Sequence, residues 1–112
     1  MSPYLHAAWE SVAQRSPITF DDFLSEFAGA DAYPVSVDGK PVGAVIVVGP
    51  EVHACISGGY GRWFKREHFL ILRALIEVYG YAQTRVTTPA GEAFVRRLGF
   101  VPCGEVWRLY GN

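Results

Sequence analysis

The sequence predicts a single α/β domain of the α+β kind, with a mixed, mostly antiparallel sheet that carries helices on both faces. Apolar residues recur at helical spacing near the N-terminus, and the apolar period changes to two after about residue 33. A long helical pattern then separates two strand-like segments, and such a crossover helix implies that these two strands run parallel. With 112 residues, the chain fits one domain spanning residues 1–112.

Two helices are predicted within residues 1–30. Ser2 is a candidate N-terminal cap of the first helix, which is expected to end between residues 14 and 17, before a proline. Thr19 is a candidate cap of the second helix, and Gly29 is a plausible stop.

Three antiparallel strands are expected to follow, over residues 33–37, 41–48 and 52–57. The first two are joined by Asp38-Gly39, a dipeptide that tolerates positive φ and is typical of tight hairpins. The segment therefore reads as a three-stranded meander.

The second half of the chain is predicted to contain a helix, a strand, a helix and two strands. Gly80 ends the long helix, and Thr88 caps the next one, which Gly99 terminates. The predicted ranges are helix 62–79, strand 84–88, helix 89–98, and strands 100–103 and 105–110. The complete order is ααβββαβαββ.

Net charge, apolar stretches and cysteine spacing argue against nucleic-acid-binding, membrane and metal-binding functions. The formal net charge is −1, which gives no support for nucleic-acid binding. The longest apolar stretch, residues 42–48, is too short to span a bilayer, and the N-terminus lacks the pattern of a signal peptide, so no membrane association is expected. Cys55 and Cys103 lack metal-ligand spacing and are expected to be reduced thiols in a cytoplasmic protein that holds no metal.

Two segments carry a resemblance to a known family. Residues 93–100, AFVRRLGF, resemble a helix that ends in F-Y-x-x-x-G-F, and residues 42–47, VGAVIV, resemble a strand of the form x-x-G-x-x-x-V. Both motifs are similar to those of the GNAT family of acyl-CoA-dependent N-acetyltransferases. The predicted element order is that family's order without its first strand. The resemblance covers residues 33–110, the acyl-CoA-binding core, and extends to the small, degenerate acetyltransferase-like proteins of tailed bacteriophages.

The resemblance implies a binding site for acetyl-CoA. In the family, backbone N–H groups of the third strand hold the acyl group, and a glycine-rich loop before the long helix holds the pyrophosphate. The corresponding candidates here are Ala54, Cys55, Ile56, Gly58, Gly59, Gly61, Arg62, Lys65 and Arg66. The family's pattern is broken where Trp63 and Lys65 stand in place of small residues. An ordinary loop with solvated basic residues is the alternative.

Glu51 and His53 are the candidates for the general base, because both lie on the third strand and share one face of it. A histidine that is merely hydrogen-bonded on a partly exposed sheet face is the alternative. The tyrosine with which many family members protonate the leaving thiolate corresponds to Val95, which cannot donate a proton, and the common asparagine corresponds to Thr88.

Two functions remain open at this stage. The first is an N-acyltransferase whose substrates are acyl-CoA and an amine, located in the cytoplasm of a bacterium or a phage-infected host. The second is a non-catalytic binding or structural protein, phage-encoded and associated with the virion or its assembly. In that case exposed aromatic residues would contact a protein partner or a second copy in a homo-oligomer. The aromatic candidates are Trp9, Trp63, Phe64 and Trp107.

Overall fold

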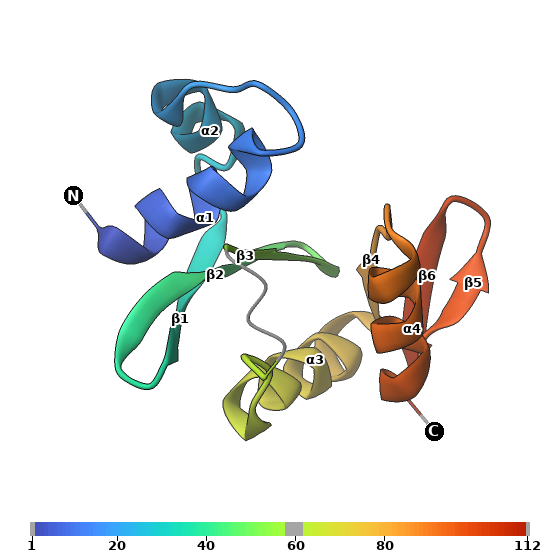
Figure 1. The fold of residues 1–112 in the computed structure, drawn as a ribbon. Helices are drawn as coiled ribbons and strands as arrows, with labels where there is room; N and C mark the ends of the chain where they lie inside the picture. Colours follow the sequence, from blue (N-terminus) through green and yellow to red (C-terminus); the bar gives the residue numbers. More distant parts are fainter. Residues whose placement is uncertain (1, 58–61, 112) are drawn as a thin grey trace. The chain divides into compact units, whose positions relative to one another are not determined.

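The computed structural model describes residues 2–57 and 62–111 (Figure 1). These residues form an α+β fold with four helices and a mixed six-stranded sheet that contains one parallel pair, which confirms the predicted class. The helices are α1 (Pro3–Ala13), α2 (Phe20–Glu26), α3 (Arg66–Tyr79) and α4 (Pro89–Leu98). The strands are β1 (Asp31–Val37), β2 (Lys40–Val48), β3 (Glu51–Ile56), β4 (Tyr81–Thr84), β5 (Val101–Cys103) and β6 (Val106–Tyr110).

The strand order is β1-β2-β3-β4-β6-β5, and β3 with β4 is the parallel pair. The chain divides into two compact units, and the division falls inside β3. The first unit comprises Met1–Val48 and Ala54–Lys65, and the second comprises Gly49–His53 and Arg66–Asn112. The first residues of β3 therefore belong to one unit and its last residues to the other.

The first unit is built on an apolar core between α1, α2 and the strands. Its buried members are Ala8, Phe23, Ala44, Ile46 and Cys55. Both helices begin where the sequence predicts, because the Ser2 and Thr19 hydroxyls accept hydrogen bonds from backbone N–H groups of the first turn. Helix α2 ends at Glu26, earlier than the predicted stop at Gly29.

The β1–β2 hairpin turns at Asp38-Gly39, as predicted, with φ of 52° and 77° at these two residues. Beyond the turn, every residue of β2 from position 42 to 47 is buried. Gly43 lies so close to the neighbouring strand that a Cβ added there would stand 2.0 Å from the carbonyl oxygen of Cys55. The glycine is therefore required by this close approach of two backbones.

In the second unit, helices α3 and α4 pack on a sheet of β4, β6 and β5. Figure 1 shows α4 lying over β4 and β6, in agreement with the contact between Gly99 and the Leu109 side chain. Helix α4 has the predicted cap, since the Thr88 hydroxyl accepts from Gly91 N at 3.0 Å, and it ends at Gly99 in the left-handed conformation. The apolar face of this unit includes Leu72, Leu75, Ala82, Val95 and Phe100.

The largest differences from the predicted ranges are in α3 and β4. Helix α3 begins at Arg66 rather than at residue 62, because residues 63–65 are not helical and the Trp63 and Phe64 rings pack edge to face at 5.4 Å. Strand β4 spans Tyr81–Thr84 rather than residues 84–88. Its backbone pairing ends where the Thr84 hydroxyl, instead of a backbone group, donates to Val52 O at 2.9 Å.

Over the residues that the structure describes, no helix is both long and apolar enough to cross a membrane.

Candidate functional site

Glu51 and His53, the two candidate bases, lie together at the start of β3 in the second unit. They are two positions apart on the strand, so their side chains share one face. His53 Nε2 lies 3.5 Å from Glu51 Oε1, and the side chains are 32% and 21% exposed, respectively. The pair is thus reachable from solvent while its members are held against each other.

Two neighbours on β4 and just beyond it hold the Glu51 carboxylate. Gln83 Nε2 donates to Oε2 at 3.1 Å, and Arg85 Nε donates to Oε1 at 3.3 Å. Glu51 and Gln83 are also register partners in the parallel pair. Because both carboxylate oxygens already accept hydrogen bonds, Glu51 is better placed to orient His53 than to take up a proton itself.

Gln83, which donates to Glu51, also accepts a hydrogen bond from a side chain of β6. Arg108 Nε donates to Gln83 Oε1 at 3.0 Å, and Arg108 is the register partner of Gln83. The guanidinium lies 4.3 Å from the centroid of the Tyr81 ring, and a hydrogen bond with Tyr110 raises the pKa of Arg108. We call Glu51, His53, Gln83, Arg85 and Arg108 the polar row.

Three members of the polar row were not predicted from the sequence: Gln83, Arg85 and Arg108. A signal was present, because Tyr81, Gln83 and Arg85 stand at alternate positions and so share one face of a strand. The strand was predicted to begin only at residue 84, so Tyr81 and Gln83 were left outside it and the alternation was missed. The pairing of Gln83 with Arg108 depends on the register of β4 and β6, which no local pattern reveals.

The direction of the backbone N–H groups at the end of β3 decides whether they are free to hold an acyl group. In the first unit Ser57 N donates to Val42 O at 2.8 Å, so position 57 faces β2. Successive residues of a strand direct their backbone groups to opposite sides, so the N–H groups of Ala54 and Ile56 point away from β2. Ala54 is exposed. These two N–H groups can therefore donate to the carbonyl of a thioester.

Cys55 contributes only its backbone to such a site. Its side chain is 4% exposed within the core of the first unit. Burial raises the pKa of this thiol to about 11, against the opposing effect of Arg15. A thiol that stays protonated at neutral pH is a poor nucleophile, so covalent catalysis by Cys55 is not expected.

The predicted phosphate-binding residues differ in their positions. Gly58, Gly59 and Gly61 lie outside the described residues. Arg62 is exposed, and Lys65 Nζ donates to Ser36 O at 3.1 Å within the first unit. Arg66 is exposed at the first residue of α3, where backbone N–H groups at the start of a helix favour anions.

Val95 and Thr88, the two positions that the resemblance compares with the family's tyrosine and asparagine, have structural roles here. Val95 is 7% exposed on the buried face of α4. The Thr88 hydroxyl is used as the cap of the same helix. Val95 has no proton to donate, and the Thr88 hydroxyl oxygen accepts the capping hydrogen bond.

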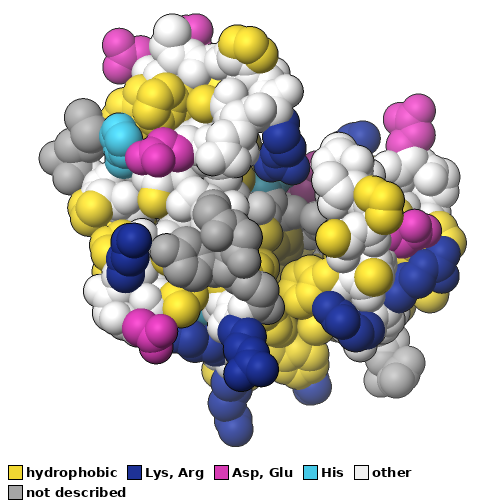
Figure 2. Space-filling model, in the orientation of Figure 1, with side chains coloured by type: hydrophobic (Ala, Val, Ile, Leu, Met, Phe, Trp, Pro, Cys, Tyr) yellow, Lys and Arg dark blue, Asp and Glu magenta, His cyan; other side chains and the backbone are white. Residues whose placement is uncertain are grey.

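The aromatic residues considered as a contact surface are partly buried and packed against neighbours. Trp9 Nε1 donates to Ile18 O at 2.7 Å, and Arg96 lies 4.8 Å from the centroid of the Trp107 ring. Trp63 packs against Phe64. Arg96 also pairs with Glu92 at 3.1 Å. Figure 2 shows basic side chains beside hydrophobic ones on the visible face of the second unit.

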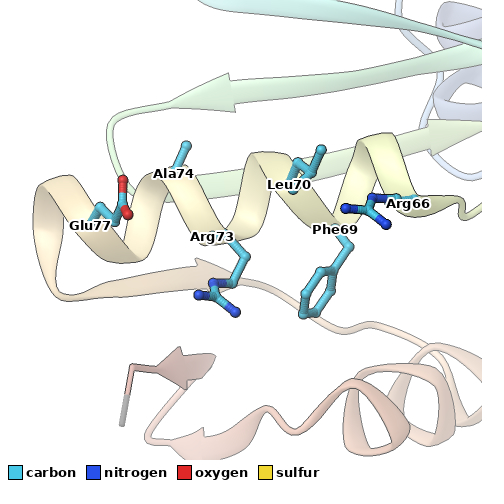
Figure 3. Close-up of a pocket in the computed structure, with 6 residues that line it drawn as sticks. All are labelled: Arg66, Phe69, Leu70, Arg73, Ala74 and Glu77. Carbon is cyan, nitrogen blue, oxygen red and sulfur yellow. The ribbon is translucent and has the colours of Figure 1, made fainter.

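Two hollows in the second unit lie along α3. The larger, of about 560 Å³, is lined by Arg66, Phe69, Leu70, Arg73, Ala74 and Glu77 (Figure 3). Figure 3 shows Phe69 and Arg73 on one side of the helix, and Leu70 and Ala74 on another. The smaller, of about 440 Å³, is lined by Phe69, Arg73, Ile76, Glu77, Leu98, Leu109, Tyr110 and Gly111. Of the predicted site residues that the structure describes, only Arg66 borders either of these two hollows.

Within residues 2–57 and 62–111, no group of three or more His, Cys, Asp or Glu side chains is arranged to hold a metal ion. The carboxylate of Glu51 interacts with Gln83 and Arg85, and the imidazole of His53 lies against that carboxylate.

Comparisons with protein-family models, with curated proteins and with solved structures found no match to this chain. A function is therefore inferred from the residues and their contacts.

Proposed function

We propose that this chain is a GNAT-type domain that transfers an acyl group from acyl-CoA, with acetyl-CoA as the expected donor, to an amine. The observation that carries the proposal is the arrangement of β3. Strand β3 pairs in parallel with β4, and Glu51, the first residue of β3, is the register partner of Gln83. Further along, Ala54 and Ile56 direct their N–H groups away from β2, as an acyl thioester would require.

The chemistry assigns separate roles to the two members of the base pair. The bound thioester supplies an activated carbonyl carbon. The His53 imidazole accepts a proton from the amine as its nitrogen attacks this carbon, and Glu51 holds the imidazole in position. The new C–N bond replaces the C–S bond, and the CoA thiolate takes a proton from water, because Val95 stands where a donor would be needed.

The diphosphate of CoA would be held by charge and by the start of α3. Arg66 and the first N–H groups of the helix, which all belong to the second unit, would supply this site. Lys65 is already engaged with Ser36 O. Because Trp63 and Lys65 replace small residues of the family's loop, we expect binding weaker than that of a complete phosphate loop.

The test combines titration calorimetry with an acyl-transfer assay. We expect heat on addition of acetyl-CoA to the protein, and transfer to an amine that falls about 100-fold or more in His53→Gln with little change in acetyl-CoA affinity. His6→Gln is the matched control, because His6 is an exposed histidine of α1 that also pairs with a glutamate, Glu10, and lies outside the polar row. Absence of heat at high micromolar protein would overturn the proposal.

A second candidate, a non-catalytic protein that retains the fold, is favoured by the structural roles of Val95 and Thr88. Such a protein would act through a protein partner or a second copy, as in virion assembly of a tailed phage. Light scattering distinguishes the two: a dimer or larger assembly at low micromolar concentration, in a sample that shows no heat with acetyl-CoA, supports the second candidate.

A further inference from the structure

The polar row contains two arginines that the proposed transfer does not use. Arg85 and Arg108 each donate to the row through Nε, one to Glu51 and the other to Gln83. An anchored Nε fixes the plane of a guanidinium group. The terminal nitrogens of that plane form the forked pairs with which arginine binds carboxylates.

The two guanidinium groups differ in exposure and rigidity. Arg108 lies over the Tyr81 ring and is hydrogen-bonded to Tyr110, so its position is fixed from two sides. The Arg85 side chain is 55% exposed and extends from the same face, two positions beyond Gln83. The polar row therefore carries two cations, Arg85 on the Glu51 carboxylate and Arg108 on the Gln83 amide.

The formal charge of the polar row favours a single negative charge on its ligand. Two guanidinium groups and one carboxylate leave a charge of +1 when His53 is neutral. A carboxylate ligand matches this charge, whereas a phosphate dianion would also face the Glu51 carboxylate.

We propose that Arg85 and Arg108 bind the carboxylate of the amine substrate, so that the acceptor is an amino acid. This inference rests on the proposed acyl transfer. It places the amine beside Glu51 and His53, where the carboxylate attracts an ammonium group and the imidazole accepts its proton. The same four side chains then select the substrate and prepare its nitrogen.

Binding is measured by NMR titration of the unmodified protein with L-alanine, L-alaninamide and inorganic phosphate, in the absence of acyl-CoA. We expect L-alanine to shift the Nε–H signals of the two arginines. L-alaninamide, which keeps the amine and lacks the carboxylate, should bind about tenfold more weakly, since a charge-assisted pair is lost. Phosphate should bind no more tightly than L-alanine.

Variants test the same assignment. Arg85→Gln should weaken L-alanine binding about tenfold, and Arg108→Lys, which keeps the charge and loses the fork, should also weaken it. Arg97→Gln is the matched control, because Arg97 is an exposed arginine of α4 outside the polar row. Equal binding of L-alanine and L-alaninamide, preferential phosphate binding, or equal losses in Arg85→Gln and Arg97→Gln would each overturn the inference.

The same samples are titrated with acetyl-CoA to separate the two proposals. If acetyl-CoA binds and L-alanine does not, the proposed carboxylate site is wrong, and the proposed acyl transfer is still supported. If L-alanine binds in preference to L-alaninamide and acetyl-CoA does not bind, the carboxylate site is supported, and the proposed acyl transfer is wrong. Because the ligand comparison uses the unmodified protein, a variant that fails to fold does not affect it.

Discussion

The two units of the chain use their polar groups in different ways. In the first unit, the Trp9 indole donates to a backbone carbonyl, and the Cys55 side chain is buried in the core. In the second unit, one face of β4 and β6 carries charged and amide side chains that bond to one another. The first unit therefore offers backbone N–H groups, and the second offers side-chain chemistry.

Strand β3 shows the contrast within six residues. Its first residues, in the second unit, present Glu51 and His53 to solvent. Its later residues, in the first unit, bury Cys55 and face β2 through Ser57. If the contrast is correct, substitutions in the first unit cost stability, and substitutions in the polar row cost binding or activity instead.

The largest expected effect is on the close approach of β2 to β3. Gly43→Ala would place a methyl group 2.0 Å from the carbonyl oxygen of Cys55, a backbone atom that can move only with its strand. We expect the free energy of unfolding to fall by about 3 kcal/mol or more, measured by chemical denaturation.

Gly39→Ala is the control for this prediction. Gly39 has a φ of 77°, and nothing lies within 4 Å of an added Cβ, so only backbone strain of about 1 kcal/mol is expected. Equal losses in the two variants would mean that the contact with Cys55 does not matter, and the tight packing assigned to the first unit would be wrong.

The next effect concerns pH and the buried thiol. Below pH 9 the Cys55 thiol is protonated in both the folded and the unfolded protein. Between 9.0, the ordinary pKa, and about 11, the folded value, the unfolded state loses its proton first. The free energy of unfolding should therefore fall as pH rises through this range, by about 2 kcal/mol in total.

Other groups titrate in the same pH range, so the measurement is a difference. Denaturation is followed from pH 8 to 11 for the unmodified protein and for Cys55→Ala. We expect the variant to be less stable at pH 8, because a cavity is left, and to lose less stability toward pH 11. If stability fell equally with pH in both proteins, the Cys55 thiol would not be shielded from water. The contrast between a buried and a solvent-exposed half of β3 would then be wrong.

Features with local causes could be predicted from the sequence. The hairpin at Asp38-Gly39, the caps at Thr19 and Thr88 and the helix end at Gly99 each follow from what one or two residues can do with their own backbone. The α+β class with one parallel pair follows from the placement of a helix between two strands.

The contacts that Gln83, Arg85 and Arg108 add to the polar row could not be predicted, because they join residues 25 to 34 positions apart in the chain. Gln83 meets both Glu51 and Arg108 only through the register of three strands. A shift of β4 by one residue would turn its side chain to the other face. The β-branched residues of positions 84–88 favoured a strand there, although backbone pairing ends at Thr84.

The smallest expected effect on stability lies in the polar row itself. Glu51→Gln keeps the shape of the side chain and removes the charge that faces Arg85 and His53. Because these groups are partly exposed, we expect the free energy of unfolding to change by less than about 1 kcal/mol, measured by chemical denaturation. The same variant should lose acyl transfer, since the imidazole is no longer held by a carboxylate. A loss of stability above about 2 kcal/mol would mean that the row supports the fold of the second unit, and the division between a structural and a chemical unit would have to be abandoned.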